Sequence, residues 1–219
     1  PVRRPFGLSR STRFTIFDRM VSPAAEELLR IHWAQRLRED AGSVREAIVR
    51  ASLEVLVEHG LTGWSLSRVA AAADCAKGSV LYHNTAKLHL LLRTTHRLRD
   101  ALVEDRLALL ARPATATQAL DRLWDHLADE VEMHLFSTWL SLMASPEESL
   151  RLGASRTEAQ LDQLRDATAD AIGTPRGTLS PELLDAVLTG LQLRLHQGDE
   201  PFAVREAYDQ FWLGVLSAA

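Results

Sequence analysis

The sequence has 219 residues, of which 46% are hydrophobic and 25% are charged, and its formal net charge is −4. This balance is typical of a globular protein, and no apolar run approaches the roughly 20 residues that a membrane-spanning helix requires. The one cysteine, Cys75, excludes an internal disulfide framework and a four-cysteine zinc site. We therefore expect a cytoplasmic protein that has no membrane partner, and the first twenty residues do not predict a signal peptide.

The charge is unevenly distributed along the chain. Residues 1–99 contain 16 Lys and Arg against 9 Asp and Glu, a net charge of +7. Residues 100–219 contain 9 against 20, a net charge of −11. Such asymmetry indicates that the first half meets a polyanion and that the second half does not.

In chain order, residues 1–42 predict an N-terminal extension made of a basic arm and one extra helix. Ser43, followed three residues later by Glu46, has the spacing of a helix start, and Gly60 ends that helix. Two short helices are expected over 65–73 and 76–83. The next helices are expected near 87–111, 115–132, 133–144, 147–171, 181–196 and 202–217. Strand signals are nearly absent, so the predicted fold is all-α.

The two short helices form the pattern of a helix-turn-helix unit. Leu66, Val69 and Ala70 make the inner face of the first helix, while Val80 and Leu81 can anchor the second. A tight turn at Asp74 and Cys75 separates them. In this motif the second helix lies in the major groove, and its N-terminal residues reach the base edges.

Residues 43–90 resemble the DNA-binding domain of the tetracycline-repressor (TetR) family. The matching positions are Gly60, Ser65-Leu66, Val69-Ala70, Ala73, Lys77-Gly78-Ser79-Val80, Tyr82-His83 and Lys87. The resemblance implies that the recognition helix reads bases or phosphates and that its flanks contact the DNA backbone. The DNA-contact residues that follow are Arg45, Ser65, Lys77, Gly78, Ser79, Tyr82, His83 and Lys87, with Arg68 as a further flanking candidate.

Four positions depart from the family pattern. Asp74 replaces a glycine in the turn, where it tolerates a left-handed backbone better than most residues. Ala76 replaces a capping hydroxyl, and its loss could cost the recognition helix about 1 kcal/mol unless Asp74 substitutes. Asn84 replaces an aromatic residue and Ala86 a serine, and we expect both to weaken the hinge to the long helix. Trp64 and Cys75 are expected to pack in the core.

The second half offers two weaker patterns. A metal site could form from residues four apart on one helix face, although a polar face is the commoner outcome. Those residues are His126, Glu130 and His134. An apolar ligand pocket could be lined by large side chains between helices, although such residues are more often core. These are Trp124, Phe136, Trp139 and Met143.

The family resemblance implies an N-terminal helix-turn-helix domain and a C-terminal helical domain for ligand binding and dimerisation. The expected boundaries are 1–42 for the extension, 43–90 for the DNA-binding domain and 91–219 for the second domain. The implied function is a repressor, released by a small apolar ligand, that binds a palindromic operator as a homodimer through helices 181–217. No cofactor and no enzymatic activity are expected. The alternatives are a metal-responsive regulator, an all-α enzyme and an interaction module that does not bind DNA.

Overall fold

The computed structural model describes residues 43–84 and 86–218, and the N-terminal extension predicted for residues 1–42 lies outside them. The described part is built from helices, which confirms the all-α prediction there. The helices are α3 (Val44–Gly63), α4 (Leu66–Ala72), α5 (Lys77–Asn84), α6 (Lys87–Leu110), α7 (Ala116–Glu132), α8 (Leu135–Met143), α9 (Glu148–Ala154), α10 (Glu158–Ile172), α11 (Pro181–His196) and α12 (Pro201–Ala218). None of these helices combines the length and the apolar character that crossing a membrane demands.

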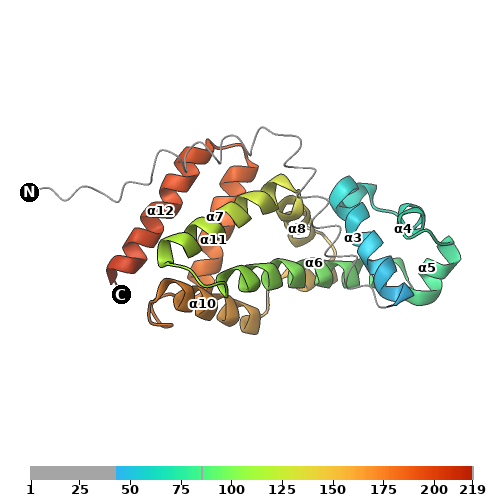
Figure 1. Ribbon diagram of the computed structural model, residues 1–219. Coiled ribbons are helices and arrows are strands. Elements are labelled where there is room, and N and C mark those ends of the chain that lie inside the picture. The colour runs from blue at the N-terminus through green and yellow to red at the C-terminus, as the bar shows by residue number, and fades with distance from the viewer. Residues whose placement is uncertain (1–42, 85, 219) are drawn as a thin grey trace, which may run out of the picture.

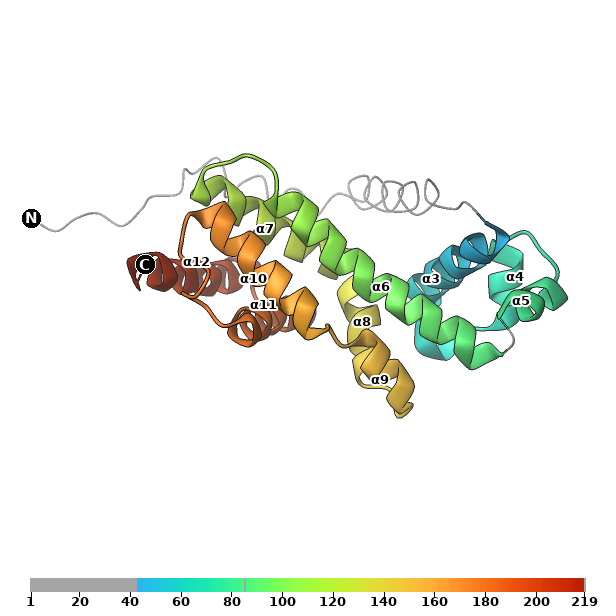
Figure 2. The same cartoon turned by 90° about the horizontal axis from the view of Figure 1, so that it is seen from below.

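The long helix α6 joins two ends of the molecule. Helices α3, α4 and α5 gather around its N-terminal part, and α7, α10, α11 and α12 lie at its other end (Figures 1 and 2). Helices α8 and α9 pack between these groups, and α8 contacts α3 as well as α7. Two helices, α6 and α8, therefore connect the α3–α5 unit to the rest of the molecule.

Each end has its own apolar core. The first core contains residues of α3–α6, α8 and α9, including the fully buried Leu56, Val69 and Val80. Because it also includes Leu98 and Trp139, this core continues past residue 90. The second core combines α7, α11 and α12 with one residue of α10.

The start of α3 follows the predicted capping pattern. Ser43 has an extended backbone, and its Oγ accepts a hydrogen bond from the backbone N–H of Glu46 at 3.2 Å. This bond satisfies one of the N–H groups that the first turn of a helix leaves without a partner. At the other end, Gly60 kinks the helix with φ 66° and ψ 177°, a backbone conformation that is essentially restricted to glycine.

The segment 147–171, predicted as one helix, is two helices. Helix α9 ends at Ala154, and Thr157 begins α10 with a complete capping box to Gln160. The Oγ1 of Thr157 accepts from the Gln160 N–H, and the Gln160 side chain accepts from the Thr157 N–H. This local capping signal starts a new helix within the range predicted as one. The break also places Arg156 at the end of a connecting segment, where its side chain reaches α11.

Candidate nucleic-acid interface

The turn between α4 and α5 adopts the geometry of a helix-turn-helix. Ser65 caps α4, and its Oγ accepts from the Arg68 N–H at 3.3 Å, which leaves its hydroxyl hydrogen free to donate. Asp74 has φ 48°, the left-handed conformation that was expected where the family has glycine. The backbone N–H of Cys75 donates to Ala70 at 3.0 Å, and the Cys75 side chain packs against the first core, as predicted.

Trp64 fixes α4 against α3 and α6. Its side chain is 3% exposed, and its Nε1 donates to the backbone oxygen and to the Oγ of Ser52, at 3.2 and 3.0 Å. Thr94 of α6 donates to the same Ser52 Oγ at 2.7 Å. The prediction that Trp64 packs under the first helix is confirmed, and the base of the helix-turn-helix unit is held by buried hydrogen bonds.

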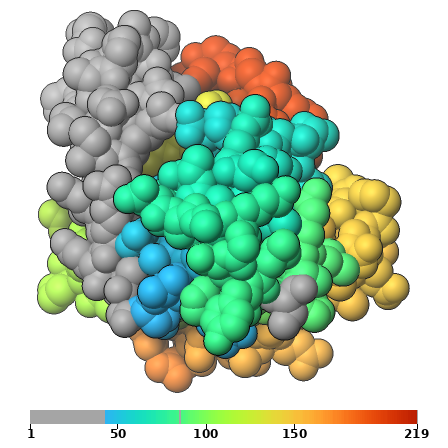
Figure 3. Space-filling view, turned by 90° about the vertical axis from the view of Figure 1, so that its right-hand side faces the viewer, coloured from blue at the N-terminus to red at the C-terminus, as the bar shows by residue number. Residues whose placement is uncertain are grey.

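Helix α5 presents one side to solvent. Val80 is fully buried and anchors the helix, whereas Lys77, Gly78 and Tyr82 are exposed, with Tyr82 at 83%. The end of the molecule in Figure 3 is formed largely by this part of the chain, and no heavy atom lies within 4 Å of a Cβ built on Gly78. Leu81 is 39% exposed, so its predicted anchoring role is wrong. It follows Val80 by about 100° around the helix and so points away from the core.

The flanking candidates lie around this exposed helix face. Ser79 and His83 are half-buried, and the His83 ring lies 5.1 Å from that of Tyr82 in an edge contact. Lys87 is exposed, and its Nζ lies 5.5 Å from the centre of the Trp64 ring. Helix α6, which begins at Lys87, has no side-chain cap because the capping residue is Ala86.

Two arginines complete the candidate surface. Arg45 is exposed in the first turn of α3. Burial lowers the pKa of Arg93, and the positive charge of Arg45 lowers it further. Arg68 donates to the backbone oxygen of Gly63 at 2.6 Å, which restrains its side chain beside the α3–α4 connection. The helix-turn-helix end therefore carries exposed cations on α3, α4, α5 and α6.

Asn84 has a role that the sequence did not reveal. It is buried, its Nδ2 donates to the Val80 backbone oxygen at 3.1 Å, and its Oδ1 accepts from Arg93 Nη1 at 3.3 Å. The substitution was expected to weaken the hinge between the recognition helix and α6. The structure shows that Asn84 forms a polar link between these two helices, and the weakening stays a prediction.

A buried ion pair lies at the other end of α6. Arg106 and Glu130 are 2% and 1% exposed, and two parallel hydrogen bonds of 3.0 and 2.6 Å join them. Gln192 of α11 accepts from Arg106 at 2.9 Å and donates to Glu130 at 2.6 Å. Burial opposes ionisation of Glu130, but the Arg106 guanidinium outweighs it and holds the pKa of that carboxyl well below its usual range. This network fastens α6, α7 and α11 together.

The metal candidates do not form a site. His126 Nε2 lies 3.0 Å from Glu130 Oε1, but both Glu130 oxygens already accept from Arg106. His134 lies beyond the end of α7, with a left-handed backbone at φ 60°, so it does not continue the face of the other two. Within residues 43–84 and 86–218, no group of three potential ligands is placed to hold a metal ion.

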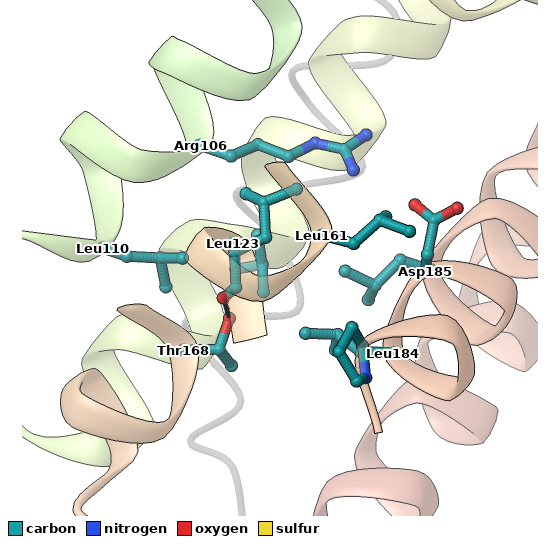
Figure 4. Close-up of a pocket in the computed structure, with 10 residues that line it drawn as sticks. Arg106, Leu110, Leu123, Leu161, Thr168, Leu184 and Asp185 are labelled. Atoms are coloured by element: carbon teal, nitrogen blue, oxygen red, sulfur yellow. Dashed lines mark hydrogen bonds between the residues drawn. The ribbon is translucent and has the colours of Figure 1, made fainter. Parts of the chain in front are cut away.

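The four predicted pocket residues do not surround one cavity. Trp124 belongs to the second core, whereas Phe136, Trp139 and Met143 belong to or pack against the first. The Nε1 of Trp139 donates a hydrogen bond to the backbone oxygen of Ala154 at 3.0 Å. A small cavity lies elsewhere, between α6, α7, α10 and α11, and Arg106 lines it together with several leucines that lie below it in Figure 4. The three aromatic residues belong to the two cores, where such side chains are found more often than around a ligand pocket.

Comparisons with known proteins agree with this geometry. No protein-family model matches the sequence. The helix-turn-helix transcriptional regulator CymR of Pseudomonas putida is 31% identical over 126 residues, which are 57% of this chain and 60% of that protein. A Rhodococcus sp. structure assigned to the TetR-family transcriptional regulators is 26% identical, with a TM-score of 0.60 over 78% of this chain and 97% of its own. A transcriptional regulator from Streptomyces coelicolor A3(2) is 25% identical, with a TM-score of 0.58 over 76% and 96%. The chain is therefore similar in sequence and in fold to transcriptional regulators, among them a structure assigned to the TetR family.

The two solved structures share the fold of this chain over about three quarters of its length. The match to CymR covers less than two thirds of that regulator's length. These proteins are transcriptional regulators and not enzymes, which agrees with the prediction that the chain catalyses no reaction.

Proposed function

We propose that this chain is a regulator of the TetR type, which binds duplex DNA as a homodimer and represses transcription until a small, largely apolar molecule releases it. The observation that carries the proposal is the exposed face of α5. Lys77, Gly78 and Tyr82 project from a short helix that the buried Val80 anchors in the first core. A helix of this kind can enter the major groove, while the capped start of α4 at Ser65 offers a hydroxyl to a phosphate.

The proposed functions are assigned to the two predicted domains. Residues 43–90 would contact DNA through Arg45, Ser65, Lys77, Gly78, Ser79, Tyr82, His83 and Lys87. Residues 91–219 would bind the effector and the second subunit. One α5 helix reads only a few base pairs, so a twofold pair that reads a palindrome supplies the specificity.

Helices α11 and α12 support the proposed dimer. Leu184 and Leu191 of α11, with Tyr208, Trp212 and Val215 of α12, are buried in the second core and are therefore not available to a partner. Other apolar side chains on these helices remain 40% to 52% exposed. They are Leu183, Phe202, Leu213 and Leu216. A partner chain that covers them would form a four-helix contact, a common mode of dimerisation in helical proteins.

The proposal is tested by selecting duplexes from a random pool with the full chain and measuring affinity for the selected duplex between about 50 and 200 mM salt. A protein that neutralises several phosphates releases their counterions, so affinity should fall steeply, by roughly 10³-fold for about six contacts. Arg112→Ala, which removes a cation near the far end of α6, is the matched control for Lys77→Ala. A flat salt dependence, or equal effects of the two variants, would contradict the proposal.

A further inference from the structure

The cavity between α6, α7, α10 and α11 has features of a binding site that is nearly closed. Its walls are mainly leucines, among them Leu123, Leu161 and Leu184, and Figure 4 shows these side chains converging below Arg106. Its volume is about 10 Å³, which is room for roughly one water molecule. Small-molecule sites usually occupy several hundred Å³. A ligand must therefore part the helices that surround the cavity.

Arg106 offers the cavity an unused hydrogen-bond donor. Its Nε and Nη2 donate to Glu130, and Nη2 also donates to Gln192. None of the described residues accepts a hydrogen bond from Nη1, although the side chain is only 2% exposed and lines the cavity. An oxygen atom of a ligand placed beside Nη1 would accept the hydrogen bond that this group can still donate.

The charges around the cavity are already balanced. Glu130 neutralises Arg106 through two hydrogen bonds. Arg156, whose side chain is 5% exposed, donates to Asp185 at 2.7 Å, and Asp185 also lines the cavity. Each guanidinium already has its own carboxylate. A ligand carboxylate or ammonium would therefore add a buried charge that no further opposite charge balances, which is strongly unfavourable.

From this arrangement we infer that the effector of this regulator is a neutral, mainly apolar molecule with one oxygen acceptor that binds Nη1 of Arg106. The inference rests on the proposed function, since it names the chemical class of the molecule that would release the DNA. Leucines surround the apolar body of the ligand, and Arg106 orients its oxygen. Carbonyl compounds, phenols, esters and lactones belong to this class.

Entry of such a ligand also provides a route to the DNA-binding end. Arg106 and Leu110 belong to α6, and the N-terminal part of the same helix carries Thr94, which bonds to Ser52 under the helix-turn-helix unit. A cavity that holds one water cannot accept the ligand without displacing α6, α7, α10 or α11. Displacement of α6 would move one copy of α5 relative to the other, so the ligand would favour a state with different spacing.

The test uses four probes of similar size with the purified full chain: acetophenone, ethylbenzene, benzoate and benzylammonium. Calorimetry gives the affinity of each, and thermal unfolding gives an independent measure of binding. We expect acetophenone to bind at least tenfold more tightly than the other three probes. At ten times its Kd it should raise Tm by roughly 3 to 6 °C. Tighter binding of benzoate or benzylammonium, or equal binding of ethylbenzene, would overturn the inference.

A pair of double variants locates the oxygen contact. Arg106→Met with Glu130→Leu removes the guanidinium without leaving its partner charged, and it should reduce the preference for acetophenone over ethylbenzene to about onefold. Arg205→Met with Asp121→Leu removes a second ion pair between helices, outside the cavity, and should leave the preference unchanged. Preference lost equally in both variants, or in neither, would contradict the assignment of Arg106.

Two readouts keep the inference separate from the proposed function. The infrared carbonyl band of bound acetophenone reports the Nη1 contact in the unaltered protein, so it does not depend on a variant that folds. The band should lie at lower frequency than in cyclohexane, and an unshifted band would overturn the contact. DNA affinity measured without any probe tests the proposed function alone. Acetophenone that binds as expected but leaves DNA affinity unchanged would contradict the effector role and support the ligand class.

Discussion

At the α4–α5 end, polar side chains such as Lys77 and Tyr82 lie exposed outside the first core, whereas at the α7–α11 end Arg106 and Glu130 are buried between helices. The exposed groups keep their hydrogen-bonding capacity for a partner in solution. The buried groups use most of their hydrogen-bonding capacity in bonds to each other. The comparison teaches that binding groups at the first end are available at once, but those at the second end become available only when helices move.

The largest expected effect comes from breaking the buried pair at one side only. Glu130→Leu leaves Arg106 charged and buried without its counter-ion, and we expect a loss of about 3 to 5 kcal/mol in the free energy of unfolding. Arg106→Met combined with Glu130→Leu should be close to neutral, because no charge is left without a partner. Urea unfolding at a fixed protein concentration measures both. Equal losses in the single and double variants would show that charge pairing does not stabilise this end.

The same pair predicts a dependence of stability on pH. The pKa of Glu130 in the folded chain is well below its ordinary value of 4.5 because Arg106 outweighs the effect of burial. The stability it contributes is therefore present above about pH 4.5 and is lost as the pH falls below that value. Urea midpoints measured from pH 7 to pH 3.5 should fall more steeply for the natural chain than for the double variant. Urea midpoints that fall equally with pH in the two proteins would contradict the assignment of this pH dependence to Glu130.

At the exposed end, substitutions should change DNA affinity more than stability. Lys77→Ala removes a candidate base or phosphate contact, and we expect a loss of about 1 to 3 kcal/mol in binding, or roughly 5- to 150-fold in affinity. The free energy of unfolding of this variant should stay within about 0.5 kcal/mol of the natural chain, because the side chain is exposed. Fluorescence anisotropy on the selected duplex and urea unfolding measure the two quantities. A stability loss with unchanged affinity would reverse the comparison.

Two positive-φ positions of the helix-turn-helix unit should differ in their effect on stability, and the second gives the smallest effect expected. Gly60→Ala should destabilise the chain by about 1 to 3 kcal/mol, since φ 66° with ψ 177° strains any residue with a Cβ. No neighbouring atom lies within 4 Å of that Cβ, so the cost would be in the backbone alone. Asp74→Gly should change stability by less than about 1 kcal/mol, because φ 48° suits both residues. Thermal unfolding ranks the two, and a larger effect at Asp74 would contradict this account of the turn.

Local patterns predicted most of the first end. The Ser43 cap, the left-handed Asp74 and the buried Trp64 each depend on residues close in sequence or on the spacing of one motif. The prediction that Leu81 anchors α5 was wrong because a helix of eight residues buries few positions. The sequence does not show which neighbour of Val80 stays exposed.

The second end resisted prediction because its interactions are long-range. Arg106 and Glu130 are 24 residues apart, and Gln192 is 86 residues from Arg106. No periodicity along one helix indicates which of many charged residues will meet across three helices. The stripe of His126, Glu130 and His134 suggested a shared face, but α7 ends at Glu132 and Glu130 turns to Arg106. The cavity was missed for the same reason, since its lining comes from four helices.

The central claim is that two copies of α5, held in one dimer, enter neighbouring major grooves. Hydroxyl-radical footprinting of the full chain on its selected duplex tests this most directly. We expect two protected segments on one face of the DNA, separated by about one helical turn, roughly 10 base pairs, or a multiple of it. We also expect that Lys77→Ala weakens both segments together. A single protected segment, or continuous protection without this spacing, would contradict the claim.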